Sequence, residues 1–407
     1  MSSVARLARR MARVGLETIS AVRPRHWDAL RLSLASPPSP VKIDVRRAGA
    51  AIEWIKRAQD ATRTGGVSWG YRARSPVRSG ERLGWQPAYP ETTGYIIEAL
   101  LRFDSLFDDP DAVERARRMA DWEVSIQLDD GGFQGGMIGA EPVESSTFVT
   151  GQVLFGLVRA HQSFGGESYR SAAHRAMDFL TSCLDDTGAF RRGYSSFCAP
   201  GAKAYEVRTG WALSLAGKTF GVATAVEGGR KTAEFALRCQ RENGWFENGD
   251  LDYHDRPLTH TIGYTLEGLF ELGALLEEER FWQGVRATLN ALRPLVRPDG
   301  FLAGRWTSNW QPAADWCCLT GSCQIACVCF RMHGCYPEEH FDELGERLLR
   351  FVASTQQLDH ANPGLRGSIH GSHPFSGEYG QYCNLNWAAK FFVDAVLDRM
   401  DLSDQRA

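Results

Sequence analysis

Residues able to transfer protons occur where apolar helix patterns begin. His260, within Leu258-Thr259-His260-Thr261, opens a stretch that is otherwise apolar. An imidazole gains and loses a proton near neutral pH, so His260 is the best single candidate for proton transfer. A core histidine held by a neighbouring side chain is the alternative interpretation. Phenols and carboxyls at comparable points extend the set, and the predicted catalytic residues are His260, Tyr205, Tyr379, Tyr382, Glu91 and Asp315.

Arginine is concentrated in one stretch, residues 71–82. Four arginines lie there against the single acid Glu81, namely Arg72, Arg74, Arg78 and Arg82. The planar guanidinium fork suits a carboxylate or a phosphate, which predicts an anionic substrate. A solvated loop is the alternative. Arg208 follows Tyr205 by three residues and so shares its helix face; we predict that Arg72, Arg74 and Arg208 bind substrate.

Aromatic side chains accompany these groups in the same segments. Their flat faces stack on sugar rings or on hydrocarbon, although any single one can simply seal a turn. The predicted substrate-binding aromatics, with one histidine, are Trp69, Trp85, Tyr89, Trp245, Trp316 and His370.

Metal and cofactor motifs are not apparent. Cys323 and Cys327 lie one helical turn apart, but on an apolar helix cysteine behaves as a small hydrophobic residue. The acidic segment 250–255 matches neither an EF-hand loop nor a zinc motif. The chain has no P-loop, no GxGxxG, no GxSxG and no paired-aspartate cyclase motif. We therefore expect no metal and no cofactor.

The elements that must position these residues follow a repeat. Asp129-Asp130-Gly131-Gly132-Phe133 separates an amphipathic helix pattern from an apolar one, and similar Gly–aromatic turns recur. Counted from Gly132, glycines fall at 188, 244 and 300, a constant interval of 56 residues, and Asn362-Pro363-Gly364-Leu365 is a weaker last copy of the turn. A fixed period of this length indicates a repeat architecture.

Six helix pairs follow from the repeat. Amphipathic first helices are predicted at 45–60, 111–127, 168–183, 226–241, 279–296 and 338–357. More apolar second helices are predicted at 92–103, 146–163, 206–220, 259–275, 316–332 and 385–399. One-sided helices belong outside and all-apolar helices inside. With no strand-like alternation between them, the pairs predict an all-α (α/α)6 toroid, a six-hairpin barrel whose long loops gather on one face.

Composition places this toroid in an ordinary soluble class, with 43% hydrophobic and 23% charged residues. Residues 1–47 hold ten Lys/Arg against three Asp/Glu, whereas the net charge is −3, so the body is acidic and nucleic acid is not an expected partner. We expect a basic N-terminal extension and Pro-rich linker over 1–43 and the toroid over 44–407. Residues 1–35 predict a basic helix that contacts a membrane peripherally or lies along the body. Ten cysteines without framework spacing favour the cytoplasm.

Several motifs resemble one family of bacterial toroid proteins. They are Asp130-Gly131-Gly132-Phe133, Thr150-Gly151-Gln152-Val153-Leu154, residues 258–264, Leu319-Thr320-Gly321-Ser322-Cys323-Gln324 and residues 386–394. Members of this family are encoded in exopolysaccharide gene clusters and are described as prenyltransferase/squalene-oxidase-repeat-like or six-hairpin-glycosidase-like. The resemblance covers residues 50–400 and implies a role in bacterial surface-polysaccharide assembly, tailoring or turnover. A reaction does not transfer with it, because the description is one of fold.

These observations favour a carbohydrate-active enzyme that acts on a uronate-containing polysaccharide or oligosaccharide. Proton abstraction beside the uronate carboxylate would make it a lyase or a C5-epimerase. An inverting glycoside hydrolase is the alternative within the class, with two carboxyls drawn from Glu91, Glu206, Asp252, Asp315 and Glu378. An isoprenoid cyclase or transferase and a non-catalytic polysaccharide-binding toroid are alternatives from other classes.

Overall fold

The computed structural model describes residues 31–32, 41–74 and 82–404. The predicted helix over 1–35 therefore lies outside the described residues except for 31–32. The Pro-rich linker and Arg78 lie outside them too.

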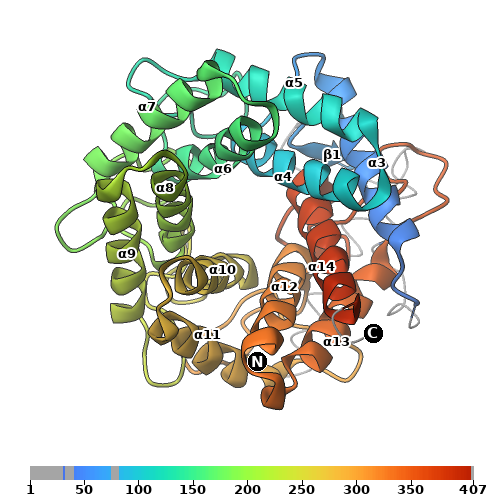
Figure 1. Ribbon diagram of the computed structural model, residues 1–407. Coiled ribbons are helices and arrows are strands. Elements are labelled where there is room, and N and C mark those ends of the chain that lie inside the picture. The colour runs from blue at the N-terminus through green and yellow to red at the C-terminus, as the bar shows by residue number, and fades with distance from the viewer. Residues whose placement is uncertain (1–30, 33–40, 75–81, 405–407) are drawn as a thin grey trace.

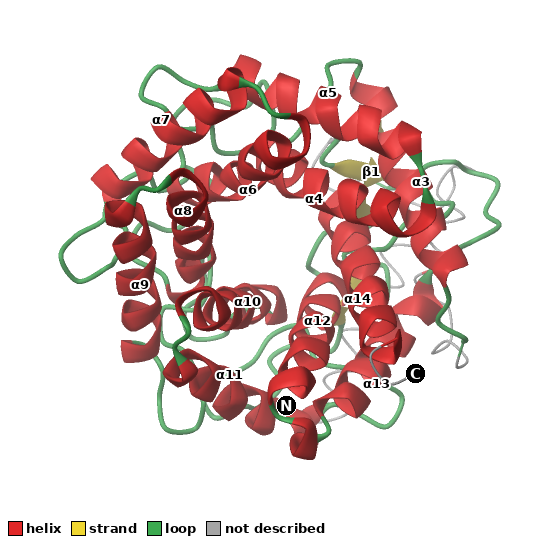
Figure 2. Ribbon diagram, in the orientation of Figure 1, coloured by secondary structure: helices red, strands yellow, loops and turns green. Residues whose placement is uncertain are grey.

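Helices form two concentric rings (Figures 1 and 2). The outer ring consists of α3 (Val45–Thr62), α5 (Pro110–Ile126), α7 (Glu167–Cys183), α9 (Ala223–Arg238), α11 (Glu279–Leu292) and α13 (Phe341–Thr355). The inner ring consists of α4 (Pro90–Phe107), α6 (Thr147–Phe164), α8 (Val207–Phe220), α10 (Thr259–Leu276), α12 (Leu319–Cys335) and α14 (Asn386–Asp404). The predicted (α/α)6 toroid is confirmed. Its helix boundaries differ from the prediction by a few residues, as expected at frayed ends.

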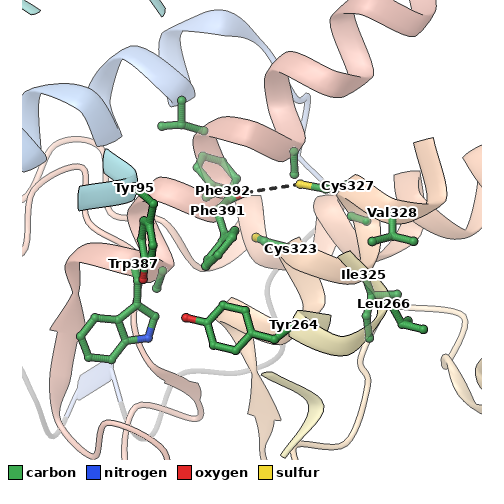
Figure 3. Packing of buried hydrophobic residues seen from close by; sticks show 14 of the residues in the cluster. Tyr95, Tyr264, Leu266, Cys323, Ile325, Cys327, Val328, Trp387, Phe391 and Phe392 are labelled. Carbon is green, nitrogen blue, oxygen red and sulfur yellow. Dashed lines mark hydrogen bonds between the residues drawn. The ribbon is translucent and has the colours of Figure 1, made fainter. Parts of the chain in front are cut away.

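Local sequence explains where the helices begin. Asp109 accepts a hydrogen bond from the N–H of Ala112 at the start of α5, and Ser146 accepts one from Val149 at the start of α6. Pro90 supplies the first residue of α4, a position that needs no amide donor. The inner helices then bury apolar residues on nearly every side. Cys323 and Cys327 of α12 lie fully buried in this packing beside Phe391 and Phe392 of α14 (Figure 3).

Six turn glycines tie each hairpin to the next. Each follows an outer helix, has positive φ, and lies so close to the following outer helix that a Cβ would come within 3.0 Å of a backbone carbonyl oxygen. Only glycine meets both conditions without strain. The glycines are Gly65, Gly131, Gly188, Gly244, Gly300 and Gly367, which approach Arg118, Arg175, Lys231, Ala287, Arg347 and Ala50 in turn. The repeat position is thus Gly131 rather than Gly132, and Gly367 completes the set where Gly364 was predicted.

The ring closes between its last and first hairpins. Gly367 packs on α3, and the Asn386 side chain at the start of α14 donates to the Ser68 carbonyl (2.8 Å) and to Thr92 Oγ1 (2.7 Å). Short strands, which were not predicted, add to this closure. Strand β1 (Gly70–Arg72) pairs antiparallel with β2 (Gly84–Trp85) and with β5 (Cys383–Leu385). A second pair joins β3 (Cys317–Cys318) to β4 (Ser372–His373).

Loop lengths distinguish the two faces of the toroid. Four of the connections from an inner helix to the next outer helix consist of two residues, as between Phe107 and Pro110. Every connection from an outer to an inner helix is much longer. All six inner helices therefore begin beneath one loop-rich face, which is where a ligand site is expected.

Candidate functional site

The second residue of each inner helix lies at the inner end of the loop-rich face. These residues are Glu91, Phe148, Arg208, His260, Thr320 and Trp387. Four of them, Glu91, Phe148, His260 and Trp387, line one cavity. The site is therefore built from equivalent positions of the repeat, because these positions in successive hairpins converge on the axis of the ring.

The cavity has a volume of about 340 Å³ and is walled largely by aromatic side chains. That size falls in the range of about 300–1,000 Å³ that is usual for small-molecule sites. Its aromatic lining comes from six segments of the chain: Trp69, Tyr89, Phe148, Tyr194, Phe197, Tyr205, Tyr264, Tyr379 and Trp387 are its rings.

A buried relay fixes the tautomer of His260. Its Nδ1 lies 2.6 Å from Gln324 Oε1, while Gln324 Nε2 donates to Glu267 Oε2 at 3.1 Å. Because that second bond sets the orientation of the Gln324 amide, Nδ1 must carry the hydrogen and Nε2 keeps its lone pair. Burial lowers the pKa of His260 to about 3, so the ring is a neutral base at physiological pH.

The other end of the relay is an ion pair under the cavity floor. Arg208 Nη1 lies 2.5 Å from Glu267 Oε2, and Arg208 Nε donates to Gln152 Oε1 at 2.8 Å. Five aromatic rings surround the guanidinium, among them Tyr95, Tyr264 and Phe391, which face one another in Figure 3. Arg208 is consequently a structural cation and not an open ligand for substrate.

Two carboxyl groups in the cavity hold their protons unusually well. Burial raises the pKa of Glu91 to about 7, opposed by the Tyr89 hydroxyl, which donates to Glu91 Oε2 at 2.5 Å, and by Arg208. Burial raises the pKa of Glu206 to about 8, although the nearby charge of Lys203 acts in the opposite direction and lowers it. Near neutral pH Glu206 is therefore mostly protonated and Glu91 about half protonated, so both repel an anionic ligand less than ordinary carboxylates would.

The cavity tyrosines are proton donors and not bases. Burial raises the pKa values of Tyr205, Tyr264 and Tyr379 well above the usual value. Trp387 Nε1 donates to the Tyr379 hydroxyl at 2.7 Å, which leaves that hydroxyl hydrogen available to another acceptor. The Tyr379 ring lies 5.4 Å from the His260 ring, centroid to centroid. A base and an acid thus stand side by side.

One cationic side chain lies in the cavity wall. Among the described lining residues, Lys203 is the single lysine or arginine, and it is almost fully buried. Its Nζ donates to the carbonyls of Ala199 and Gly201, with 3.2 Å to the latter, which holds the charge beside Glu206. The inner-helix N-termini around the cavity also favour a negative ligand.

Six of the predicted site residues meet at the cavity: Trp69, Tyr89, Glu91, Tyr205, His260 and Tyr379. Sequence reasoning did not select Phe148, Phe197, Tyr264 and Trp387 as site residues. The signal that identifies Phe148 and Trp387 is their place as second residue of an inner helix, and Tyr264 lies one turn beyond His260.

Predicted cationic and catalytic residues outside the cavity have other contacts. The Arg72 guanidinium lies 5.9 Å from the Trp69 ring centroid, and the buried Arg74 lies over the Tyr382 ring at 5.0 Å. Tyr382 is itself buried with Leu365 and Phe375 in a separate cluster. Asp315 is exposed on the loop before β3 and does not line the cavity.

The remaining predicted binding residues pack against other side chains within the loops. Trp85 packs against Trp54, and Trp245 packs edge-on against Trp310 at 5.4 Å. Trp316 is buried with Leu258 and Cys318. His370 is buried beside Phe375. Their aromatic character serves the packing of the loop-rich face, which was the alternative interpretation of these residues.

Metal ligation has no geometric support in the part of the chain that the structure describes, since no three His, Cys, Asp or Glu side chains converge there on a common point. Asp250, considered for a cation, instead binds Arg305 Nη1 at 2.9 Å. Within the same residues, no helix has the length and apolar character needed to cross a membrane.

Solved structures with the same architecture include hydrolases and a lyase of saccharides. An unsaturated glucuronyl hydrolase specific for heparin aligns with a TM-score of 0.69 at 14% identity, over 88% of this chain and 97% of that one. The unsaturated glucuronyl hydrolase of Bacillus sp. GL1 gives 0.64 at 13%, over 87% and 96%. A polysaccharide lyase gives 0.62 at 11%, over 88% and 98%. No family model matches the sequence, and no curated protein matches it.

These likenesses define the class by fold: the chain is an (α/α)6 toroid. At such low identity they carry no activity with them.

Proposed function

We propose that this protein is a carbohydrate-active enzyme that binds one uronate residue of an acidic saccharide in the cavity and moves the proton at C5. The observation that carries the proposal is the pairing of His260, whose Nε2 is held unprotonated by Gln324, with the proton-bearing Tyr379 hydroxyl. The saccharide names of the structural neighbours support the substrate class.

The chemistry follows from the charges. The charge of Lys203 offsets that of the uronate carboxylate, and the protonated carboxyl of Glu206 donates a hydrogen bond to it, which together make the C5 hydrogen more acidic. His260 Nε2 takes that proton. In a lyase, Tyr379 then protonates the departing O4 as the C4–O4 bond breaks and the C4–C5 double bond forms. In an epimerase, His260 keeps the proton that it took, the Tyr379 hydroxyl donates a proton to the opposite face of C5, and no bond to O4 breaks.

The low pKa of His260 in the empty cavity is compatible with this role. Burial disfavours the imidazolium ion, but the negative charge that develops on the uronate as C5 loses its proton favours it, which raises the pKa of His260 when the proton must be held. The base is thereby activated by the ligand it acts on.

The test is incubation of the purified protein in D2O with a panel of uronate saccharides that includes bacterial surface polysaccharides. Absorbance near 232 nm, where a 4,5-unsaturated uronate absorbs, identifies a lyase. Deuterium at C5 without cleavage identifies an epimerase. His260→Gln and Tyr379→Phe should each lower the rate of either reaction by at least about 10²-fold. Tyr382→Phe is the matched control, because Tyr382 lies outside the cavity.

Inverting hydrolysis is a second candidate, supported by the presence of Glu91 and Glu206 in the same cavity with raised pKa values. It would use one carboxyl as acid and one as base. New reducing ends, without absorbance or deuterium, and their loss in Glu91→Gln or Glu206→Gln would establish it and overturn the proton-abstraction proposal.

A further inference from the structure

Phe197 is exposed in a way that packing does not explain. With 54% of its surface accessible, it is the most exposed large hydrophobic side chain among the described residues. An isolated exposed apolar residue is common on protein surfaces. Phe197, however, also lines the cavity, so its ring lies at the boundary between the cavity and solvent.

The ring is supported from one side. Gly136, in the preceding loop-rich segment, has φ +78°, and a Cβ there would lie 2.4 Å from Phe197 Cε2. The absence of a side chain at Gly136 therefore lets the ring lie directly on the backbone. This contact holds one part of the ring against the backbone, while more than half of the residue's surface stays accessible to solvent.

The segment that carries Phe197 is anchored to the neighbouring loop. The Ala199 N–H donates to Asp252 Oδ1 at 3.0 Å and to the Leu251 carbonyl at 3.2 Å, and the Ala204 N–H donates to the Asn248 carbonyl at 3.0 Å. Leu251 lines the cavity as well. Phe197 is thus a fixed platform and its position relative to the cavity is set by three successive loops.

We infer that Phe197 forms a second saccharide subsite, on which the sugar residue next to the one in the cavity stacks. The inference rests on the proposed function for the nature of the ligand. A saccharide whose uronate occupies the cavity continues through its mouth toward solvent, where Phe197 lies. The next ring of the saccharide can then contact the accessible part of Phe197, and the CH groups of a sugar ring pack well on an aromatic ring.

With this subsite the protein would bind at least two consecutive sugar residues. Stacking on one aromatic ring is worth roughly three- to tenfold in affinity, so a ligand of two residues should bind more tightly than one of a single residue by about that factor. Further residues should add little.

The experiment measures calorimetric dissociation constants for saturated glucuronate, mannuronate and galacturonate oligosaccharides of one to four residues. His260→Gln is the background, because the proposed reaction needs that base and turnover then does not interfere. When Phe197→Ala is added to this background, the affinity gained by lengthening the saccharide from one residue to two should disappear. Phe197→Trp should retain that gain. Val143→Ala is the matched control, since Val143 is 47% exposed on a neighbouring loop and does not line the cavity.

The outcomes separate the two proposals. A gain that survives Phe197→Ala, or a loss of affinity that is equal for one and two residues, would overturn the second subsite. A gain that depends on Phe197, together with no deuterium exchange, cleavage or unsaturated product in the wild-type protein, would support the subsite and overturn the proposed function. Failure of every oligosaccharide to bind would overturn both.

Discussion

The ion pair beneath the cavity gives the sharpest test of how this fold is held together. Replacing Arg208 with methionine keeps most of the side-chain length but removes the charge. Glu267, which is 4% exposed, would then be a buried carboxylate whose remaining hydrogen bond is the one from Gln324 at 3.1 Å. We expect Arg208→Met to lower the free energy of unfolding strongly.

The magnitude follows from the geometry. Two unit charges about 4 Å apart interact by about 4 kcal/mol at an effective dielectric constant of 20. Removal of one partner from a buried pair costs about 3–5 kcal/mol, because the other charge is left uncompensated. Arg208→Met should therefore destabilise the protein by about 3–5 kcal/mol. The double variant Arg208→Met/Glu267→Gln should recover much of that loss, since no isolated charge remains.

Urea denaturation followed by tryptophan fluorescence measures this cycle directly, with both single variants and the double variant compared at one pH. The control is Arg280→Met, which removes a half-exposed guanidinium (49% exposed) paired with Glu234 at 2.7 Å and with Glu278 at 2.6 Å. Because these pairs lie at the surface, the loss should be about 1 kcal/mol for each pair or less. A neutral Arg208→Met, or a double variant whose loss equals the sum of the singles, would refute the assignment of Arg208 as a buried structural cation.

Three further predictions follow from other buried groups. Folded Glu91 holds its proton to a pKa of about 7 against an ordinary value of 4.5, so the folded state binds more protons than the unfolded one in this interval. The free energy of unfolding should consequently fall as pH rises from 4.5 to about 7, by an amount on the order of 3 kcal/mol, and Glu91→Gln should flatten that dependence in denaturation curves. Glu123 is fully buried, neither carboxyl oxygen has a hydrogen-bond partner, and burial raises its pKa well above the usual value. Glu123→Leu should raise the free energy of unfolding by about 1–3 kcal/mol at pH 8, and a lower Tm would contradict this. Gln324→Leu should lower kcat by roughly tenfold or more with little change in KM, while Gln324→Glu should move the acidic limb of the pH–rate profile upward; unchanged profiles would show that Gln324 does not position His260.

The fold was predictable because its signals are local. Each Gly–aromatic turn ends an outer helix, and the alternation of one-sided with all-apolar helices is visible within about 15 residues. The last turn was misplaced at Gly364 because its aromatic partner is missing there. What identifies Gly367 is its contact with the Ala50 carbonyl, more than 300 positions away in the sequence. The short strands were missed since two or three residues carry no alternation.

The site was predictable only where helix position determined it. His260 and Glu91 were found because both stand in the first turn of an inner helix. Arg208 occupies the same position, yet its side chain is taken up by Glu267 and Gln152 on two other helices. Hydrogen-bond partners on other helices cannot be recognised from the sequence pattern around Arg208. The same limit explains Trp245, whose ring is covered by Trp310.

The distribution of charge around the barrel explains how an acidic protein can hold an acidic ligand. Below the cavity the buried charges are paired, as in Arg208 with Glu267 and Lys390 with Asp394. Paired charges add little net field at the ligand. Selectivity for an anion then depends on the groups at the cavity wall: Lys203, the inner-helix N-termini, and two carboxyls that stay protonated because burial raises their pKa values. Anion affinity should therefore decline above about pH 8, when Glu206 also becomes charged, even though no residue that binds the ligand has been lost.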